Sequence, residues 1–484
     1  MVTNSSPASN RRQLLKVGGA LAVGGALVMV GALSIRRRQT LAAGPSGSSR
    51  GLTAAPARLR LFGEQRPATS VFGYNGAAPG PVLRIPQNKA FHVRVENQLG
   101  QDTTVHWHGV RLPNNMDGVP GLTQPPIKPG GDFTYAFTPP DAGTFLYHSH
   151  DNSLEQIGRG LAGVLIVEEA EPIKVDRELV WVIQDWRLDD GLQIAGRFGN
   201  RMEAAMAGRV GNVVSVNGDA TSPVPVRAGE RIRLRIANAA TARIMALAFE
   251  GHRPVVVALD GQPCDPHEPA GGRLLLGPGM RADVVLDLSG EPGRRYAVAD
   301  DFYGDQLGYT VAKLAYEDAS PIRAHPLDSP VRLPANPLPA PDLTSAERHE
   351  IVLQGGMMGG MGMMGGMMGM GGGATWAING KSMTGDGAPG MPPLLTLRRG
   401  RTCRLAFKNE TAWWHPMHLH GHAFRVLTRN GVAVDRVIWG DTVLVEPHQS
   451  VEVAFVAANP GDWMLHCHIV DHQVSGLMTT IRVA

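Results

Sequence analysis

The sequence predicts an all-β protein built from three β-sandwich domains. Glycine (60 residues) and proline (36 residues) are abundant in the 484-residue chain, and charged residues make up only 18%. This composition is typical of turn-rich β proteins. One turn-and-strand unit occurs three times along the chain, and no long stretch has the periodicity of an amphipathic helix.

The repeated unit begins with an Asn-Gly turn and ends with an alternating strand followed by a second asparagine. The copies are Asn75-Gly76 with strand 91–95 and Asn97, Asn217-Gly218 with strand 232–236 and Asn238, and Asn379-Gly380 with strand 403–407 and Asn409. Alternation with period two is the pattern of a strand buried on one face. Strands are also expected over 281–288 and 450–455.

The repeats divide the chain into domains. We predict domains over 50–170, 171–320 and 345–484, with a proline-rich linker over 321–344 and a Met/Gly-rich insert over 355–373 in the third domain. A length of 484 residues is sufficient for several separate hydrophobic cores.

Residues 1–43 have the pattern of an export signal. Arg11 and Arg12 precede an apolar, glycine-rich run over 17–33, which is short for a membrane span. Paired arginines before a weakly hydrophobic run favour the twin-arginine export machinery, with an ordinary secretory signal or an uncleaved anchor as the alternatives. We therefore expect a periplasmic or secreted protein with no stable membrane span after cleavage near Ala42 or Ala43.

Charge and cysteine content limit the classes of partner. The formal net charge of +3 gives no reason to expect a nucleic-acid or anionic-membrane partner. Three cysteines are present, Cys264, Cys403 and Cys467. In an exported protein Cys264 and Cys403 either form a disulfide or remain buried thiols, and the sequence leaves both alternatives open.

Histidines occur in pairs with one residue between them. The five pairs are His106/His108, His148/His150, His418/His420, His420/His422 and His466/His468. Composition alone predicts fewer than one such pair, so packing is a poor explanation for all of them. Residues i and i+2 of a strand point to the same face, so each pair presents two imidazoles to a transition metal. The pairs fall in the first and third domains, and we expect these domains to meet at one polynuclear metal site.

Cys467 lies between two of these histidines and points to the opposite face of its strand. It therefore binds a different metal from His466 and His468, only a few bonds away. His415 and His472 are the neighbouring candidates for its partners. One thiolate with two imidazoles is the ligand set of a blue-copper electron-transfer site.

These motifs together resemble those of the multicopper oxidase family. His106-Trp-His108-Gly, His148-Ser-His150, His415-x-x-His418-x-His420-Gly and His466-Cys-His468-x-x-x-His472 occur in the family's order. The resemblance covers nearly the whole chain after the signal and is nearest to bacterial three-domain laccases and copper-efflux cuprous oxidases. It implies three cupredoxin-like Greek-key β-sandwich domains.

The resemblance also implies four copper ions and their ligands. His415, Cys467 and His472 would hold the mononuclear blue copper, and His106 and His418 the normal (type 2) copper. The binuclear pair would take His108, His148, His150, His420, His466 and His468. The implied reaction is one-electron oxidation of a substrate at the blue copper, coupled to four-electron reduction of O2 to water. His422 falls outside the set, and we expect it to pack.

Two positions near the metals depart from the pattern of many bacterial relatives. Leu477 occupies the axial position of the blue copper where many relatives have methionine, which should raise its potential. A one-residue bulge that makes Met478 the axial ligand is the alternative. Gln473 stands where many relatives have glutamate, so proton supply falls to Asp117 or to water. A simple turn role for Asp117-Gly118 is the alternative.

The Met/Gly-rich insert and the substrate remain open at the level of sequence. The insert is either a flexible loop or a collector of Cu(I), because thioethers are soft ligands. Its methionines are Met357, Met358, Met361, Met363, Met364, Met367, Met368 and Met370. Phenols, Cu(I), and Mn(II) or other metals are the candidate reductants. Trp413 and Trp414 either shape the substrate entrance or pack. The rival function is copper sequestration with little turnover.

Overall fold

The computed structural model describes residues 50–329, 331–357, 375–387, 390 and 392–484. These residues form paired β-sheets with short helical turns, the longest of which has six residues. The predicted all-β fold class is confirmed. Among the described residues, no helix has the length and apolar character needed to cross a membrane. The proposed export segment over 1–43 lies outside the described residues.

The first region contains a four-stranded sheet in the order β2-β1-β4-β5 and a three-stranded sheet in the order β3-β7-β6. Parallel pairing of β1 with β4 places Ala54 beside Asn97. Its elements are β1 (Arg50–Leu59), β2 (Thr69–Tyr74), β3 (Leu83–Pro86), β4 (Phe91–Asn97), η1 (Asn114–Met116), β5 (Asp132–Phe137), β6 (Gly143–His148), α1 (Ser153–Gly158) and β7 (Ala162–Glu168).

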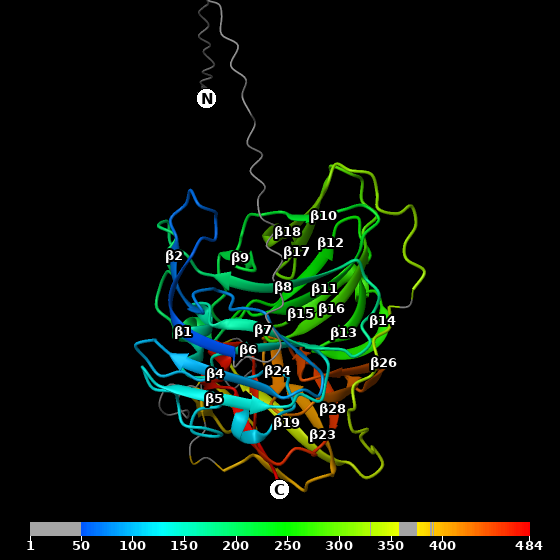
Figure 1. Ribbon diagram of the computed structural model, residues 1–484. Coiled ribbons are helices and arrows are strands. Elements are labelled where there is room, and N and C mark those ends of the chain that lie inside the picture. Colours follow the sequence, from blue (N-terminus) through cyan, green and yellow to red (C-terminus); the bar gives the residue numbers. More distant parts are fainter. Residues whose placement is uncertain (1–49, 330, 358–374, 388–389, 391) are drawn as a thin grey trace, which may run out of the picture. The chain divides into compact units, whose positions relative to one another are not determined.

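The second region has a six-stranded sheet, β14-β13-β16-β11-β8-β9, and a five-stranded sheet, β10-β18-β17-β12-β15 (Figure 1). The buried apolar side chains of these sheets form a core of their own. Its elements are β8 (Arg177–Trp186), α2 (Arg201–Ala204), β9 (Val213–Val216), β10 (Val224–Val226), β11 (Arg231–Asn238), β12 (Met245–Phe249), β13 (Val255–Leu259), β14 (Gln262–His267), η2 (Ala270–Gly272), β15 (Arg273–Leu276), β16 (Arg281–Asp287), β17 (Arg295–Asp300), η3 (Asp305–Leu307) and β18 (Tyr309–Tyr316).

The third region has sheets in the orders β20-β19-β23-β28-β25-β26 and β22-β31-β29-β24-β27, and a short β21-β30 pair. Its elements are β19 (Glu347–Gly355), β20 (Trp376–Ile378), β21 (Met383–Thr384), β22 (Leu395–Leu397), β23 (Thr402–Asn409), β24 (His415–Leu419), β25 (Phe424–Arg429), β26 (Val432–Gly440), β27 (Thr442–Val445), β28 (Ser450–Val456), β29 (Gly461–Cys467), α4 (Val470–Val474), β30 (Ser475–Gly476) and β31 (Met478–Val483). Its apolar core is continuous with that of the first region.

The three Asn-Gly turns share one set of hydrogen bonds. Asn75, Asn217 and Asn379 all have positive φ, between 49° and 54°, and a positive-φ glycine follows each of them. Each side-chain oxygen accepts a backbone N–H from a neighbouring strand, at 2.7, 2.9 and 2.6 Å respectively. Asparagine tolerates the left-handed conformation that such a turn requires. The sequence repeat is therefore also a structural repeat.

The proline-rich segment is packed against both earlier regions. Residues 321–329 and 331–346 contain no strand. The Asn336 amide donates to the Ala142 carbonyl at 2.8 Å and to Gln262 Oε1 at 2.9 Å, and it accepts from the Ala142 N–H at 2.9 Å. The side chain of Leu333 is buried. Hydrogen bonds and apolar contact thus hold this segment in place.

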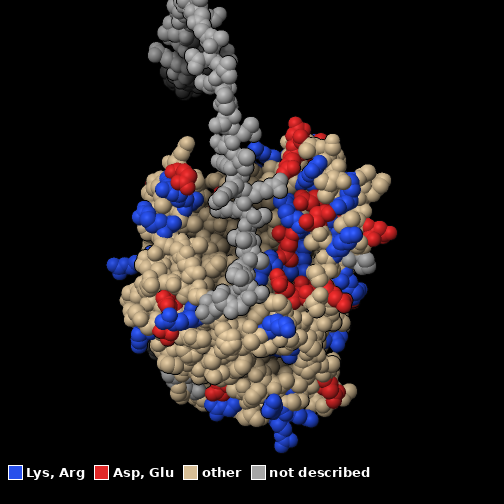
Figure 2. All heavy atoms as spheres, viewed as in Figure 1, with Lys and Arg blue, Asp and Glu red and all other residues tan. Residues whose placement is uncertain are grey.

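The cysteines are buried and unpaired. Cys264 belongs to the core of the second region, whereas Cys403 belongs to the core shared by the first and third regions. Side chains in two separate cores cannot reach the short separation that a disulfide requires. The structure therefore favours two buried free thiols. Figure 2 shows a face on which acidic and basic side chains lie interspersed, in keeping with the small net charge.

Candidate metal centres

The first two histidine pairs are brought together by a backbone bridge. The His106 N–H donates to the His148 carbonyl at 2.9 Å, and the His148 N–H donates back to the His106 carbonyl at 3.1 Å. His148 ends β6, and the residue two positions on, His150, points to the same site. The first region therefore presents four imidazoles at one place.

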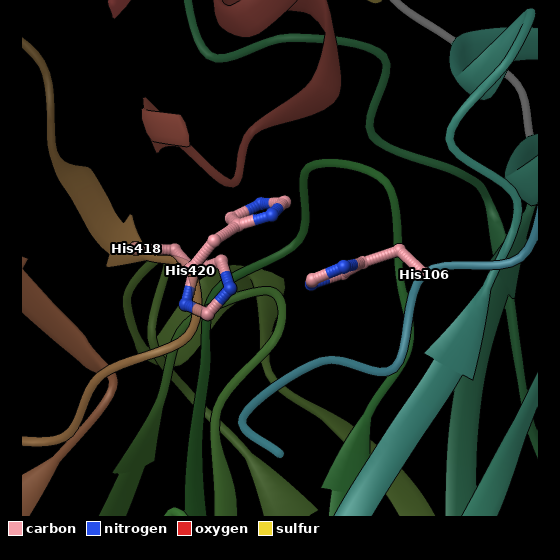
Figure 3. Close-up of side chains that lie close together, drawn as sticks. All are labelled: His106, His418 and His420. Carbon is pink, nitrogen blue, oxygen red and sulfur yellow. The ribbon is translucent and has the colours of Figure 1, made fainter. Parts of the chain in front are cut away.

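The third region supplies four more imidazoles from two paired strands. β24 and β29 are antiparallel, with His418 opposite His466 and Met417 opposite Cys467. Directly opposite residues in an antiparallel pair point to the same face. His418 and His466 thus face the first region, and Cys467 faces the interior of its own sandwich. Figure 3 shows the His106 ring pointing toward His418 and His420.

The eight imidazoles form one buried cluster between the first and third regions. None of the eight side chains is more than 4% exposed. Three sets of ligand atoms lie within 4.8 Å of one another: His106/His418/His420, His106/His108/His148 and His150/His420/His466. The stacked rings of His106 and His420, with centroids 3.8 Å apart, join residues from the two regions.

The hydrogen bonds of this cluster leave unprotonated nitrogens at its centre. His420 Nδ1 donates to Asp117 Oδ2 at 2.8 Å, and His466 Nδ1 donates to the Cys467 carbonyl at 3.0 Å. Their Nε2 atoms then face each other as two lone pairs at 3.0 Å, which is repulsive without a cation. The buried atoms His106 Nε2, His108 Nδ1, His150 Nε2, His418 Nε2 and His468 Nδ1 have no hydrogen-bond partner among the described residues.

Burial keeps His108, His148, His150 and His468 neutral. Desolvation lowers the pKa of His108, His150 and His468 well below the usual value, and it lowers the pKa of His148 to about 3. Neighbouring imidazoles lower these pKa values further. A neutral imidazole with a free, inward lone pair is the form that binds a transition metal. The donor set therefore fits copper.

A second, smaller centre lies on the other face of β29. Cys467 Sγ is 3.6 Å from His415 Nδ1 and 3.6 Å from His472 Nδ1, and all three residues are fully buried. Burial raises the pKa of the Cys467 thiol, so the thiolate needs a cation beside it. Burial also lowers the pKa of His472 to about 3.

Hydrogen bonds to neutral oxygens set the tautomers at this second centre. The Thr411 hydroxyl donates to Asn409 Oδ1 at 2.7 Å and accepts from His415 Nε2 at 2.8 Å. His472 Nε2 donates to the Met206 carbonyl at 2.7 Å. The two Nδ1 atoms are therefore lone pairs that face each other at 3.2 Å. The Trp376 ring covers both imidazoles, at 5.0 Å from His415 and 4.3 Å from His472.

The register of β31 separates the two axial candidates. Met478 lies opposite His466 without a register shift, so its side chain is on the face of the histidine cluster. It packs with Val119, Met383 and Met464. Leu477 is fully buried in the same core as Cys467, and its carbonyl accepts the Cys467 N–H at 3.0 Å. The structure thus shows no bulge that turns Met478 toward the sulfur.

Asp117 lies directly behind the histidine cluster. Its side chain is 1% exposed, and its backbone carbonyl accepts the His106 Nδ1 proton at 2.8 Å while Oδ2 contacts His420. The turn role holds as well, because a Cβ on Gly118 (φ +84°) would lie 1.9 Å from the Val105 carbonyl oxygen. Asp117 therefore both forms the turn and contacts two imidazoles of the cluster.

Other predicted residues fall beside the centres. His422 packs on Phe455 and Trp463. Trp413 donates its indole N–H to the Met357 carbonyl at 2.8 Å, and the Trp414 ring is 5.4 Å from Phe302. Gln473 is buried. Of the eight methionines of the insert, Met357 is described; Met358, Met361, Met363, Met364, Met367, Met368 and Met370 lie outside the described residues.

A second carboxylate, which the sequence patterns did not predict, lies beside the cluster. Asp441, 1% exposed, accepts from His108 Nε2 at 3.0 Å through Oδ1, and its carbonyl accepts from His418 Nδ1 at 2.9 Å. The sequence held one indication, because Asp441 lies one residue before the apolar run 443–445, and an acidic residue next to a buried strand is costly to bury without a partner. Arg281 and Met206 gave no such indication, since their partners lie far away in sequence.

Comparisons with known proteins agree with this geometry. Three family models, each described as multicopper oxidase, match residues 61–172, 177–319 and 368–484. A multicopper oxidase of Mycobacterium tuberculosis is 32% identical over 479 residues, covering 89% of this chain and 86% of that protein. Copper resistance protein A of Pseudomonas syringae is 30% identical, covering 58% of this chain and 52% of that protein.

Solved structures extend the similarity to the whole fold. The multicopper oxidase of Pseudomonas thermotolerans has a TM-score of 0.80 and 34% identity, covering 90% of this chain and 99% of its own. A metallo-oxidase of Campylobacter jejuni has a TM-score of 0.73 and 25% identity, covering 90% of each chain. From the buried donor sets and these matches together, this chain belongs to the multicopper oxidase family, whose members carry four copper ions and reduce O2 with electrons from a reducing substrate.

Proposed function

We propose that this oxidase is exported and that its physiological reductant is Cu(I). His415, Cys467 and His472 would hold the copper that receives electrons, and the eight clustered histidines would hold the other three. When bound, these coppers supply the redox chemistry: four electrons, taken one at a time from the substrate, reduce one O2 with four protons to two waters. The protein itself contributes geometry, proton supply and access.

The proposal that Cu(I) is the reductant rests on one observation: the second region, through Met206, covers the His472 imidazole. Its side chain is fully buried, and its outer nitrogen is bonded to the Met206 carbonyl. An organic substrate therefore cannot touch the imidazole edge, and electrons must pass through the covering segment. The Met206 side chain is 37% exposed and that of Met202 is 58% exposed, so two thioethers lie at the surface of this cover.

The Met/Gly-rich insert begins at the same place. The Met357 N–H donates to the Ala205 carbonyl at 2.7 Å, which puts the start of the insert beside Met206. Thioethers are soft ligands that suit Cu(I), and glycines between them allow several to gather around one ion. Relatives include a copper resistance protein and a metallo-oxidase, which supports a metal substrate.

Replacing both surface methionines tests this proposal. Met202→Leu with Met206→Leu removes two sulfurs and keeps side-chain size. We expect the KM for Cu(I) to rise several-fold while O2 uptake with a phenol keeps its rate, because the buried centres are untouched. Deleting 358–370 should act in the same direction. Equal losses with both reductants would contradict a Cu(I) site, and efficient phenol oxidation with no Cu(I) oxidation would favour an organic reductant.

Export rests on the amino-terminal residues alone. Arg11 and Arg12 before the apolar run support the twin-arginine machinery, which would deliver the protein to the periplasm or outside the cell. Arg11→Lys with Arg12→Lys should keep the protein in the cytoplasm when cells are fractionated. Unchanged export of this variant would point to an ordinary secretory signal.

A further inference from the structure

The second region provides none of the clustered histidines, yet one of its loops enters the cluster. The turn between β15 and β16, residues 277–280, lies against the rings. Gly279 has φ of +81°, and a Cβ there would be 2.7 Å from His468 Cδ2 and 2.9 Å from His108 Cε1. The backbone of the second region therefore forms a wall of the histidine cluster.

Arg281, the first residue of β16, is the buried link between all three regions. It is fully buried, and its Nη1 and Nη2 donate to Asp441 Oδ1 at 2.9 Å and Oδ2 at 2.6 Å. Its Nε donates to the Thr144 carbonyl in the first region at 3.2 Å. A two-pronged guanidinium–carboxylate pair fixes orientation as well as distance. The carboxylate of Asp441 is therefore held in one plane.

A second carboxylate holds the backbones on either side of this pair. Asp260 accepts the Arg281 N–H at 2.9 Å and the Thr442 N–H at 3.1 Å. The starts of β16 and β27 are thus tied together across two regions. Asp441 lies directly before Thr442, so both its main chain and its side chain are positioned from the second region.

This orientation determines which nitrogen of His108 faces the cluster. Asp441 Oδ1 accepts the His108 Nε2 proton, so Nδ1 is left as a buried lone pair with no hydrogen-bond partner. His106 and His418 present Nε2, because each donates Nδ1 to a backbone carbonyl, with Asp117 Oδ1 and Asp441 Oδ1 also 3.3 Å from these Nδ1 atoms. His108 Nε2 contacts side-chain oxygens instead, Asp441 Oδ1 at 3.0 Å and Thr442 Oγ1 at 3.2 Å. The Thr442 hydroxyl donates its own proton to Asp441 Oδ1 at 2.8 Å, so the tautomer of His108 depends on the carboxylate that Arg281 holds.

We propose that Arg281 is a positioning residue of the trinuclear site: by fixing Asp441, it makes His108 present Nδ1 to copper. The inference rests on the ligand set proposed above. Loss of a residue that orients a metal ligand typically weakens metal affinity or activity by about 10–100-fold. We expect that loss to fall on the three-copper cluster and to leave the blue centre intact.

Arg281→Met and Arg281→Lys test this role in the copper-loaded protein. Methionine removes the guanidinium group and its charge, whereas lysine keeps the charge but cannot make the two-pronged pair with the Asp441 carboxylate. In both variants we expect copper to leave the cluster about 10–100-fold faster under a chelator, and the type 2 electron paramagnetic resonance signal to change. The blue absorption band of the Cys467 centre should keep its intensity and position.

Arg231→Lys is the matched control. Arg231 is also buried in the second region and makes a two-pronged pair with Asp287, at 2.7 and 2.8 Å, and its Nη1 donates to the Ser329 carbonyl, so these hydrogen bonds involve neither Asp441 nor a copper histidine. Equal copper loss in this variant would show a general effect on folding and overturn the proposal. Unchanged copper retention and an unchanged type 2 signal in Arg281→Met would overturn it as well.

A measurement on the wild type keeps the proposal testable if both Arg281 variants fail to fold. In the fully reduced, diamagnetic holoenzyme, nitrogen-15 NMR should show His108 protonated at Nε2, assigned by comparison with His108→Gln. Protonation at Nδ1 would overturn the inference. A wild-type protein that shows no blue band would instead contradict the proposed ligand set, so the two failures are distinguishable.

Discussion

The two metal centres share one strand but differ in what surrounds them. At the Cys467 centre, the outer nitrogens of His415 and His472 both bond neutral oxygens, from Thr411 and Met206. At the histidine cluster, carboxylates lie behind the imidazoles: Asp117 behind His420 and Asp441 behind His108. An electron-transfer site handles no protons, whereas O2 reduction consumes four. Carboxylates therefore contact the histidines of the centre whose reaction consumes protons, and neutral oxygens contact those of the centre that only transfers electrons.

The centres also differ in how many regions build them. The ligands of the Cys467 centre come from residues 415–472 of one sandwich, and the second region only covers them. The cluster takes four histidines from the first region and four from the third region, and the backbone of the second region forms one of its walls. A site at an interface depends on the packing of whole domains. We expect substitutions between regions to damage the cluster before they damage the blue centre.

Removing the sulfur should have the largest effect. Cys467→Ser deletes the thiolate ligand, so the blue absorption band should vanish and turnover with either reductant should fall to background, because electrons no longer reach the cluster. Visible spectroscopy and O2 uptake check this. His422→Gln, two residues from His420 but only packed on aromatic rings, should retain both properties; a blue band that survives Cys467→Ser would contradict the assignment.

Two variants of Asp117 should distinguish its role in orienting the His420 imidazole from a role in supplying protons for O2 reduction. Asn at this position still accepts the His420 Nδ1 proton but carries no acidic proton, whereas Ala does neither. If Asp117 delivers protons, O2 reduction should fall about 10–100-fold in Asp117→Asn and at least as far in Asp117→Ala, with the blue band unchanged. Steady-state O2 consumption at several pH values gives the answer. Wild-type turnover in Asp117→Asn would leave Asp117 with a positioning role alone.

The smallest effect concerns the axial position. Leu477→Met introduces a thioether on the face of Cys467, which stabilises Cu(II) and lowers the blue-copper potential. A lowering of about 60 mV would correspond to a tenfold change in the one-electron equilibrium. Redox titration of the blue band measures it. Met478→Leu, on the opposite face, should leave the potential unchanged; an equal or higher potential in Leu477→Met would show that the side chain does not approach the copper.

The sequence by itself determined the features that depend on local geometry. The period of two along a strand is a property of the backbone, so it was enough to place His466 and His468 on one face and Cys467 on the other. The same parity separated Leu477 from Met478. The Asn-Gly turns were equally readable, because few residues adopt positive φ without strain.

Only the tertiary structure decided which distant residues contact the metal-binding side chains. The contact between Asp441 and His108 spans 333 positions, and the covering of His472 by Met206 spans 266. The pairing of Arg281 with Asp441 and the separation of Cys264 from Cys403 likewise depend on how sandwiches pack together. Strand periodicity says which way a side chain points, but the partner it meets is set by the packing of distant segments, and that packing has no local signature in the chain.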